Sequence, residues 1–257
     1  METRAFDPAM IWQPLPSLLS YLDVTLLVAA LSIVLGSLLG LVLAWAKLSG
    51  IRPLRYLAQA YTYVMRCTPS IVLLFIVFYG LPELARAAFH VDINGWHRAI
   101  YAVITFLLLF GAYISEVFRA AYLAVPRGQY EAAVSIGLTP WQAFWKVLLP
   151  QAALIALPNF GNSSINLLKE GALAYTIGLI DLIGKGNLII AQNYGAYGIE
   201  IYLACLIIYW VLVNLVEKGF ALLEKSLAKG QSAAATQNRT RNTRKRRWLA
   251  WCSIFNS

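Results

Sequence analysis

One long uncharged run near the start of the chain limits what this sequence can fold into. From Val24 to Ala46 there is no Asp, Glu, Lys or Arg. A helix of about 23 residues is roughly 35 Å long at 1.5 Å per residue, which is enough to cross a hydrocarbon core of ~30 Å. The run is too long for the apolar core of a cleavable signal peptide, so we expect it to remain in the protein as a first membrane span.

Further apolar segments repeat this pattern. We expect spans at residues 24–46, 56–80, 99–125, 147–168 and 199–216. The second contains Arg66 and Pro69, and the fourth is interrupted by Pro150 and Pro158. A run at 172–183, of about 12 residues, is too short to cross and should form a buried helix or a partial re-entry. The predicted fold class is all-α, a polytopic transmembrane helical bundle of about five spans.

The composition supports a membrane protein and argues against several other classes. Hydrophobic residues make up 60% of the chain and charged residues only 13%, against about 25% charged in soluble proteins. The net charge is +9, but six of the 21 basic residues lie between Arg239 and Arg247. The excess therefore belongs to a tail that can meet membrane lipid, and no nucleic-acid partner is expected. The three cysteines have neither disulfide nor zinc spacing, and His90, His97 and Asp92 are too few for a metal site.

The placement of basic residues predicts the orientation, because basic loops are retained on the cytoplasmic side. With the N-terminus outside, the inner segments hold three, three and nine basic residues, against five on the outer side. We therefore expect an external N-terminus and a cytoplasmic C-terminus. The expected organisation is an external segment at 1–22, a transmembrane domain at 23–225 with a cytoplasmic loop at 126–150, and a basic, disordered cytoplasmic tail at 226–257.

The cytoplasmic loop carries a spaced motif. It reads Glu131-Ala132-Ala133, three residues, Gly137, nine residues, and then Val147-Leu148-Leu149-Pro150. A short helix ended by Gly137 would project from the bilayer, and its small alanines would let another surface approach closely. This motif resembles the EAA signature of the membrane-spanning subunits of ATP-binding-cassette importers, with Val147 in place of the usual Ile. The alternative is an ordinary capped loop.

The resemblance extends over nearly all of residues 18–225 and is to the polar amino acid branch of those importers. It is carried by Thr25-Leu26, Arg66-Cys67-Thr68-Pro69, the segment Gly111 to Arg119, Leu149-Pro150-Gln151-Ala152, Leu157-Pro158-Asn159 and Leu168-Lys169. After the acidic residue that follows Lys169, the family usually has two hydroxyl residues, and this chain has Gly171 and Ala172. A fainter similarity at 174–181 is to the cystine and sulfur amino acid carriers.

The resemblance implies a permease subunit of the bacterial plasma (inner) membrane that forms the translocation pathway of an amino acid importer and is not an enzyme. It implies two ATP-binding-cassette ATPase subunits, a second permease subunit (self or homologue) and an external solute-binding protein. ATP and Mg would bind the partner ATPase, since this chain lacks the GxxxxGK[ST] motif and no cofactor is expected on it. The resemblance assigns the contact with the ATPase to the coupling helix and the residues after it: Gln129, Glu131, Ala132, Ala133, Gly137, Leu149 and Pro150.

Polar residues inside the expected spans indicate where a substrate could pass, because ionisable groups in a membrane usually face a bundle interior or a pathway. Arg66 lies about ten residues into the second span. In the fourth span, polar residues at helical spacing follow Pro158 and so share one face of the helix as a polar stripe. The proposed pathway residues are Arg66, Thr68, Glu116, Asn162, Asn166, Lys169 and Glu170. We expect Arg66 and Glu116 to offset each other; in the rival arrangement Glu116 pairs with Arg119. The same stripes could instead hold spans or subunits together.

Two other classes of function remain open from the sequence. One is a secondary amino acid transporter driven by an ion gradient, which would show inverted repeats with broken helices in both halves. The other is a membrane scaffold or sensor, which would lack a polar pathway.

Overall fold

The computed structural model describes the backbone of residues 6–254 and the side chains of residues 6–227. Every regular element in that part of the chain is a helix. The elements are α1 (Ala9–Trp12), α2 (Leu15–Leu19), α3 (Leu22–Leu48), α4 (Arg52–Cys67), α5 (Ser70–Phe75), η1 (Ile76–Gly80), α6 (Leu81–Phe89), α7 (Arg98–Ala124), α8 (Arg127–Ser135), α9 (Pro140–Ala143), η2 (Phe144–Leu148), α10 (Leu149–Glu170), η3 (Gly171–Ile177), α11 (Leu182–Gln192) and α12 (Gly198–Ile254). The all-α prediction is confirmed.

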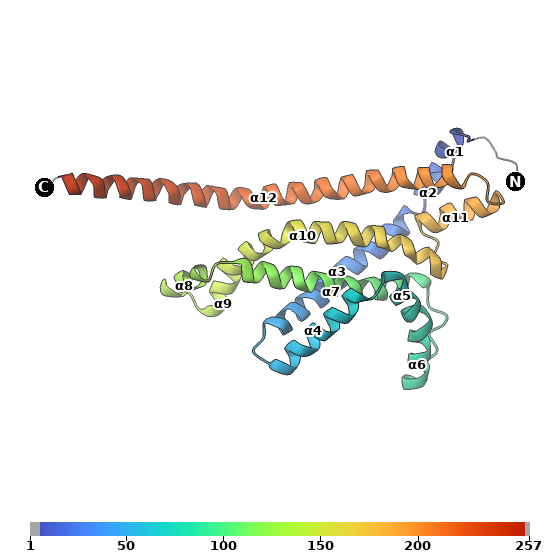
Figure 1. The fold of residues 1–257 in the computed structure, drawn as a ribbon, viewed down its shortest axis with the longest axis horizontal. Helices are drawn as coiled ribbons and strands as arrows, with labels where there is room; N and C mark the ends of the chain where they lie inside the picture. The colour runs from blue at the N-terminus through green and yellow to red at the C-terminus, as the bar shows by residue number, and fades with distance from the viewer. Residues whose placement is uncertain (1–5, 255–257) are drawn as a thin grey trace.

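Five helical segments in the described part are long and apolar enough to cross a membrane, as predicted. They are Leu22–Leu48, Ser70–Phe89, Arg98–Ala124, Pro140–Ile177 and Gly198–Leu227. The two ends of the bundle carry different elements. Helices α1, α2 and α11 lie at one end in Figure 1, and α8 and α9 lie at the other. The loop that carries the spaced motif therefore lies at the end opposite to the N-terminus.

Helix α7 is the centre of the bundle. More than half of its most apolar stretch is buried, against less than a third in each of the other four segments. The main cluster of buried side chains gathers around it, and α3 and α10 make its most extensive contacts. The exposed leucines and valines of α3 face away from this core, as expected for a helix that meets lipid on its outer side.

Helices α3 and α7 approach each other closely because glycines line their contact. A Cβ added to Gly36 would lie 3.0 Å from the carbonyl oxygen of Leu107, and one added to Gly40 would overlap the side chain of Ile114. Gly111 of α7 meets Leu39 in the same way, at 2.8 Å. The GxxxG pattern at Gly36 and Gly40 thus packs α3 against α7 within one chain, in agreement with the small-residue rule for helices in membranes.

The second predicted span differs from the structure. A continuous helix was expected over 56–80, but α4 ends at Cys67 and α5 begins at Ser70, with Thr68 and Pro69 both in extended conformation. Proline explains the break, because it removes a backbone donor and pushes the preceding residue out of the helical region. The apolar segment that is long enough to cross is consequently Ser70–Phe89, and α4 is a separate amphipathic helix.

The segment expected as one short buried helix at 172–183 is divided. Its first part is the 3-10 helix η3, and Gly178 then turns the chain with a φ of +79°. Asp181 caps the following helix α11 by accepting a hydrogen bond from the backbone N–H of Gly184. The segment is short as expected, but it is only partly buried, with Tyr175 40% and Ile180 42% exposed. A glycine that permits positive φ splits it.

The C-terminal region also departs from expectation. A disordered tail was predicted for residues 226–257, whereas the backbone of α12 continues as one helix to Ile254 (Figure 1). The segment has no proline, and its five alanines and five arginines favour helix even where no core can form. The prediction of disorder rested on the Ser, Thr and Asn residues between them. Residues 255–257 lie outside the described part. The division into an external segment, a transmembrane domain and a tail remains a prediction.

Candidate functional site

The loop after α7 forms the projecting helix that its motif predicts. Helix α8 ends at Ser135, and Gly137 has a φ of +92° with nothing within 4 Å of an added Cβ. The Gly137 N–H donates to the Val134 carbonyl at 2.9 Å, which closes the last turn of the helix. A residue other than glycine would be strained at this φ, so Gly137 sets the length of α8.

The surface of α8 is open for a partner. Gln129, Glu131 and Ala132 are exposed, whereas Ala133 is buried against the rest of the loop. Ile136, just after the helix, is 80% exposed. Further along, Leu149 and Pro150 begin α10 directly after the π-helical turn η2, within the continuous segment Pro140–Ile177. A local π-turn is one way in which a membrane helix accommodates a proline. The motif residues thus lie on two elements: the exposed helix α8 with the turn after it, and the start of α10, which returns into the bundle.

A second candidate site is an open cavity of about 610 Å³ beside α7 and α10. Its wall combines apolar side chains from both helices with a charged end. It is lined by Leu109, Phe110, Tyr113, Ser163, Asn166, Leu167, Lys169, Glu170 and Leu173. A mostly apolar cavity with a few polar and charged groups is the usual form of a small-molecule site.

The broken second segment meets this cavity. The hydroxyl of Ser70, the first residue of α5, donates to Glu170 Oε2 at 2.9 Å. The hydroxyl of Thr68 instead donates to the Val64 carbonyl at 2.8 Å, within the last turn of α4. The break between α4 and α5 therefore lies next to the acidic end of α10. Discontinuous helices of this kind commonly form the binding sites of transporters.

Arg66 lies near the same cavity. Its guanidinium carbon is 5.7 Å from the centre of the Tyr113 ring, a cation–π geometry, and Tyr113 lines the cavity. Arg66 is exposed, and among the described side chains it has no carboxylate within ion-pair distance. The cavity thus has Lys169 and Glu170 in its wall and Arg66 beside it.

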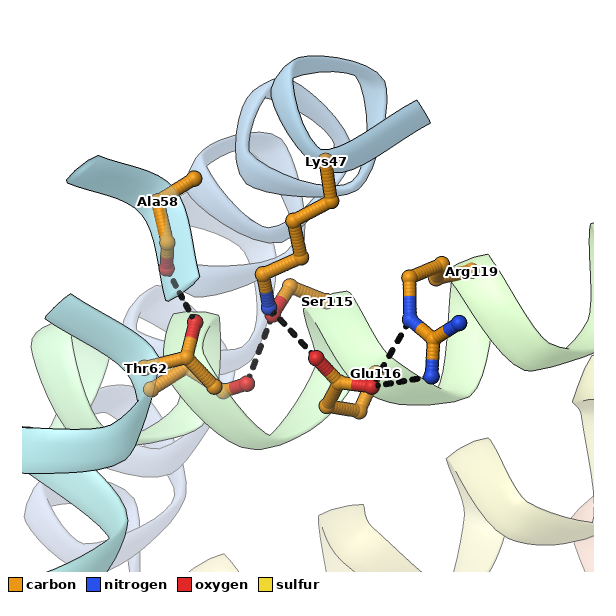
Figure 2. Close-up of polar contacts among 7 residues, drawn as sticks. Lys47, Ala58, Thr62, Ser115, Glu116 and Arg119 are labelled. Atoms are coloured by element: carbon orange, nitrogen blue, oxygen red, sulfur yellow. Dashed lines mark hydrogen bonds and ion pairs between the residues drawn. The ribbon is translucent and has the colours of Figure 1, made fainter. Parts of the chain in front are cut away.

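The expected pair of Arg66 with Glu116 is wrong. Figure 2 shows Glu116 between two other cations: Lys47 Nζ lies 2.8 Å from Glu116 Oε1, and Arg119 Nη2 lies 2.8 Å from Glu116 Oε2. The rival arrangement with Arg119 is therefore present, together with a partner from α3 that sequence reasoning missed. The first expected span, 24–46, ends one residue before Lys47, whereas Lys47 still belongs to the last turn of α3.

The structure brings only some of the proposed pathway residues together. Asn166, Lys169 and Glu170 line the cavity, and Arg66 lies beside it. Asn162 is exposed outside the lining, Thr68 bonds within α4, and Glu116 belongs to the ion cluster. Ser163, which belongs to the polar stripe after Pro158, also lines the cavity. Phe110 and Tyr113 were missed because an aromatic side chain in an apolar run gives no signal of its own.

A multi-pass helical bundle with a broken span, an open cavity that has charged groups in its wall, and a projecting loop has the architecture of the membrane subunit of a transporter. The chain belongs to the family of binding-protein-dependent transport system inner membrane components, whose model matches residues 17–229. The family and the five apolar helices place it in the bacterial plasma membrane as a multi-pass transport subunit. ATP hydrolysis in such systems belongs to a separate subunit.

Relatives and solved structures agree with this family. The chain is 40% identical over 233 residues to the L-cystine transport system permease protein TcyL of Bacillus subtilis (strain 168), covering 91% of this chain and 96% of that protein. It is 33% identical over 224 residues to the octopine transport system permease protein OccM of Rhizobium radiobacter, covering 86% and 90%. The crystal structure of an amino acid ABC transporter with histidines matches with a TM-score of 0.74 and 32% identity, covering 87% of this chain and all of that chain.

Proposed function

We propose that this chain is the permease subunit of an ATP-driven importer for amino acids, and that the cavity beside α7 and α10 takes the substrate. The N-terminus would lie outside and the C-terminus in the cytoplasm. The observation that carries the proposal is the presence of both charge signs at one apolar cavity, with Lys169 and Glu170 in its wall and Arg66 beside it.

An amino acid must exchange the hydration of a carboxylate and an ammonium for protein partners, because an unpaired charge away from water is costly. The Arg66 guanidinium and the Lys169 ammonium suit the carboxylate, and Glu170 suits the ammonium. Ser70 holds the Glu170 carboxylate through one oxygen. The apolar wall, including Phe110 and Tyr113, would then contact the side chain of the substrate.

L-cystine is the first substrate to test. A relative with 40% identity is a permease of an L-cystine transport system, and a second protein of that printed function is 37% identical over 203 residues. Gly171 and Ala172 stand between the lining residues Glu170 and Leu173 and carry no hydroxyl, which agrees with a less polar substrate.

The family's general organisation supports the partners of this proposal. The exposed face of α8, including Gln129, Glu131 and Ala132, would seat in a cytoplasmic ATPase that binds ATP and Mg, with one ATPase for each of two permease subunits. An external solute-binding protein would deliver the amino acid to the opposite end of the bundle.

The site is tested by uptake of labelled L-cystine into vesicles that hold the assembled transporter and internal ATP. Glu170→Gln and Arg66→Gln should each lower uptake at subsaturating substrate by about tenfold or more, because each removes a charged partner worth roughly 1.5–3 kcal/mol. Glu83→Gln is the matched control, since Glu83 is an exposed carboxylate on α6. Uptake by both cavity variants at the level of this control would contradict the assignment of the cavity.

A further inference from the structure

Lys47 places a positive charge in a nearly dry part of the bundle. Its side chain is only 1% exposed, although it lies in the last turn of α3. Its ammonium donates to Ser115 Oγ at 2.7 Å and to Glu116 Oε1 at 2.8 Å (Figure 2). The Ser115 hydroxyl in turn donates to the Ala112 carbonyl at 2.7 Å. A buried ammonium is tolerated only when it is paired and hydrogen-bonded in this way.

The carboxylate of Glu116 connects two helices through different oxygens. Oε1 accepts a hydrogen bond from Lys47 Nζ of α3. Oε2 lies 2.9 Å from Nε and 2.8 Å from Nη2 of Arg119, a contact within α7 itself. Arg119 is 36% exposed on its side chain, so the bond within the helix faces partly toward solvent. The bond between helices is the buried one. Glu116 is therefore held in one orientation, and that orientation ties the cytoplasmic end of α7 to α3.

The tie lies at the end of a rigid seam. Gly36, Gly40 and Gly111 leave no room for a Cβ between α3 and α7, and a contact packed this closely has low compressibility and transmits strain. From Glu116, α7 continues for about eight residues, or roughly 12 Å, before the chain turns through Val125 and Pro126 into α8. A rotation of the last two turns of α7 would consequently swing α8.

We propose that Lys47 is a positioning residue of the transport cycle: through Glu116 it fixes the rotation of the end of α7 against α3 and so sets the direction in which α8 presents itself to the ATPase. This inference rests on the proposed function, in which α8 is the contact with the ATPase. Lys47 itself touches neither the substrate cavity nor α8. Its effect would therefore be on the coupling of ATP hydrolysis to uptake.

The test compares L-cystine uptake per ATP hydrolysed in vesicles containing the assembled transporter. The variant Lys47→Met with Glu116→Gln removes both charges and leaves no unpaired buried ion. We expect folded yield and co-purified ATPase close to wild type, but a fall of about tenfold in uptake per ATP, the size of effect seen when residues between two sites carry their coupling. Glu83→Gln with Arg86→Gln removes an exposed pair on α6 and should change nothing.

Two single variants sharpen the result. Lys47→Met removes the donor to Glu116 and leaves the Glu116–Arg119 pair intact, so it tests the tie if the double variant does not fold. Arg119→Gln removes a charge of the same cluster without breaking the tie to α3, and its uptake per ATP should stay near wild type. Wild-type coupling in Lys47→Met, or no folded protein from either Lys47 variant, would overturn the proposal. Failure of the wild type itself to couple ATP to uptake would instead contradict the proposed function.

Discussion

Removing one charge of the Lys47–Glu116 pair should cost more stability than removing both. Removing the carboxylate leaves a buried ammonium with Ser115 as its remaining partner. Removing both charges leaves only the Arg119 guanidinium, which is 36% exposed and can be hydrated. We expect Glu116→Gln to lower the free energy of unfolding by about 3–5 kcal/mol and the double variant Lys47→Met with Glu116→Gln to recover most of it. Thermal unfolding in detergent measures both. Equal losses in the single and the double variant would show that the pair is not the reason.

The glycine seam gives a second prediction at the residue scale. Gly40→Ala places a methyl group where Ile114 already lies, so α3 and α7 must separate or distort. Overpacking of this kind costs about 1–3 kcal/mol. Gly219→Ala in α12 is the control, because nothing lies within 4 Å of its added Cβ. The midpoint temperature of thermal unfolding should fall for Gly40→Ala and stay level or rise for Gly219→Ala. The reverse order would contradict the close approach of α3 and α7.

At the scale of elements, α11 depends on a buried carboxylate at its start. Asp181 is 2% exposed, its Oδ1 accepts from the Gly184 N–H, and its Oδ2 has no hydrogen-bond partner among the described atoms. Burial raises the pKa of Asp181 from 3.8 to about 6. A raised carboxyl pKa means that the folded protein binds the proton more tightly. The contribution of Asp181 to stability is thus fully present below pH 3.8 and is lost as the pH rises through about 6.

Asp181→Asn should therefore stabilise the protein at pH 7.5, by roughly 1–3 kcal/mol, because the amide keeps the cap and has no charge to desolvate. The gain should shrink toward pH 4, where Asp181 is protonated in the folded state. Thermal unfolding between pH 4 and 8 measures this, with Glu83→Gln as an exposed control. A gain that does not depend on pH would contradict the role of the buried charge.

How far the elements follow from the sequence depends on the kind of signal. Uninterrupted apolar length places α3, α7 and the first part of α12, and a glycine at positive φ ends α8 where the motif requires it. The division between α4 and α5 has a local cause in Pro69, but proline also occurs inside α10 at Pro158 without ending that helix. Local sequence therefore does not decide between a kink and a break, because neighbouring helices supply the compensating contacts.

The candidate site was harder to foresee for the same reason. Asn166, Lys169 and Glu170 follow helical spacing and were identified, whereas the partner of Glu116 comes from another helix, Lys47 of α3. Spacing along one helix shows which residues share a face, and it carries no information about which face of a distant helix packs against it.

At the scale of the whole molecule, the family match ends at residue 229, although the backbone of α12 continues to Ile254. We predict that removal of residues 230–257 leaves uptake within a few-fold of wild type, because this segment lies beyond the matched bundle; its basic residues would add lipid attraction of about 1 kcal/mol each. Uptake by the truncated protein at equal membrane abundance tests this. A much larger loss would assign the segment to the transport cycle.

Helix α8 is the proposed contact between the bundle and the ATPase. Glu131→Lys reverses a charge on the exposed face of α8 and should reduce the amount of co-purified ATPase by about tenfold, an effect typical of a charged interface residue, while the protein still inserts and folds. Arg86→Glu, a reversal on the exposed side of α6, is the control. Normal ATPase recovery with Glu131→Lys would count against α8 as the docking element.

The central claim is that this chain forms the pathway of an importer driven by ATP on a partner subunit. Its most direct test is the uptake of labelled L-cystine into vesicles that contain the permease, its ATPase and the external binding protein. The claim predicts uptake that requires ATP on the ATPase side and persists when ionophores collapse the proton and sodium gradients. Uptake that continues without ATP and stops when a gradient is collapsed would contradict it and identify a secondary transporter.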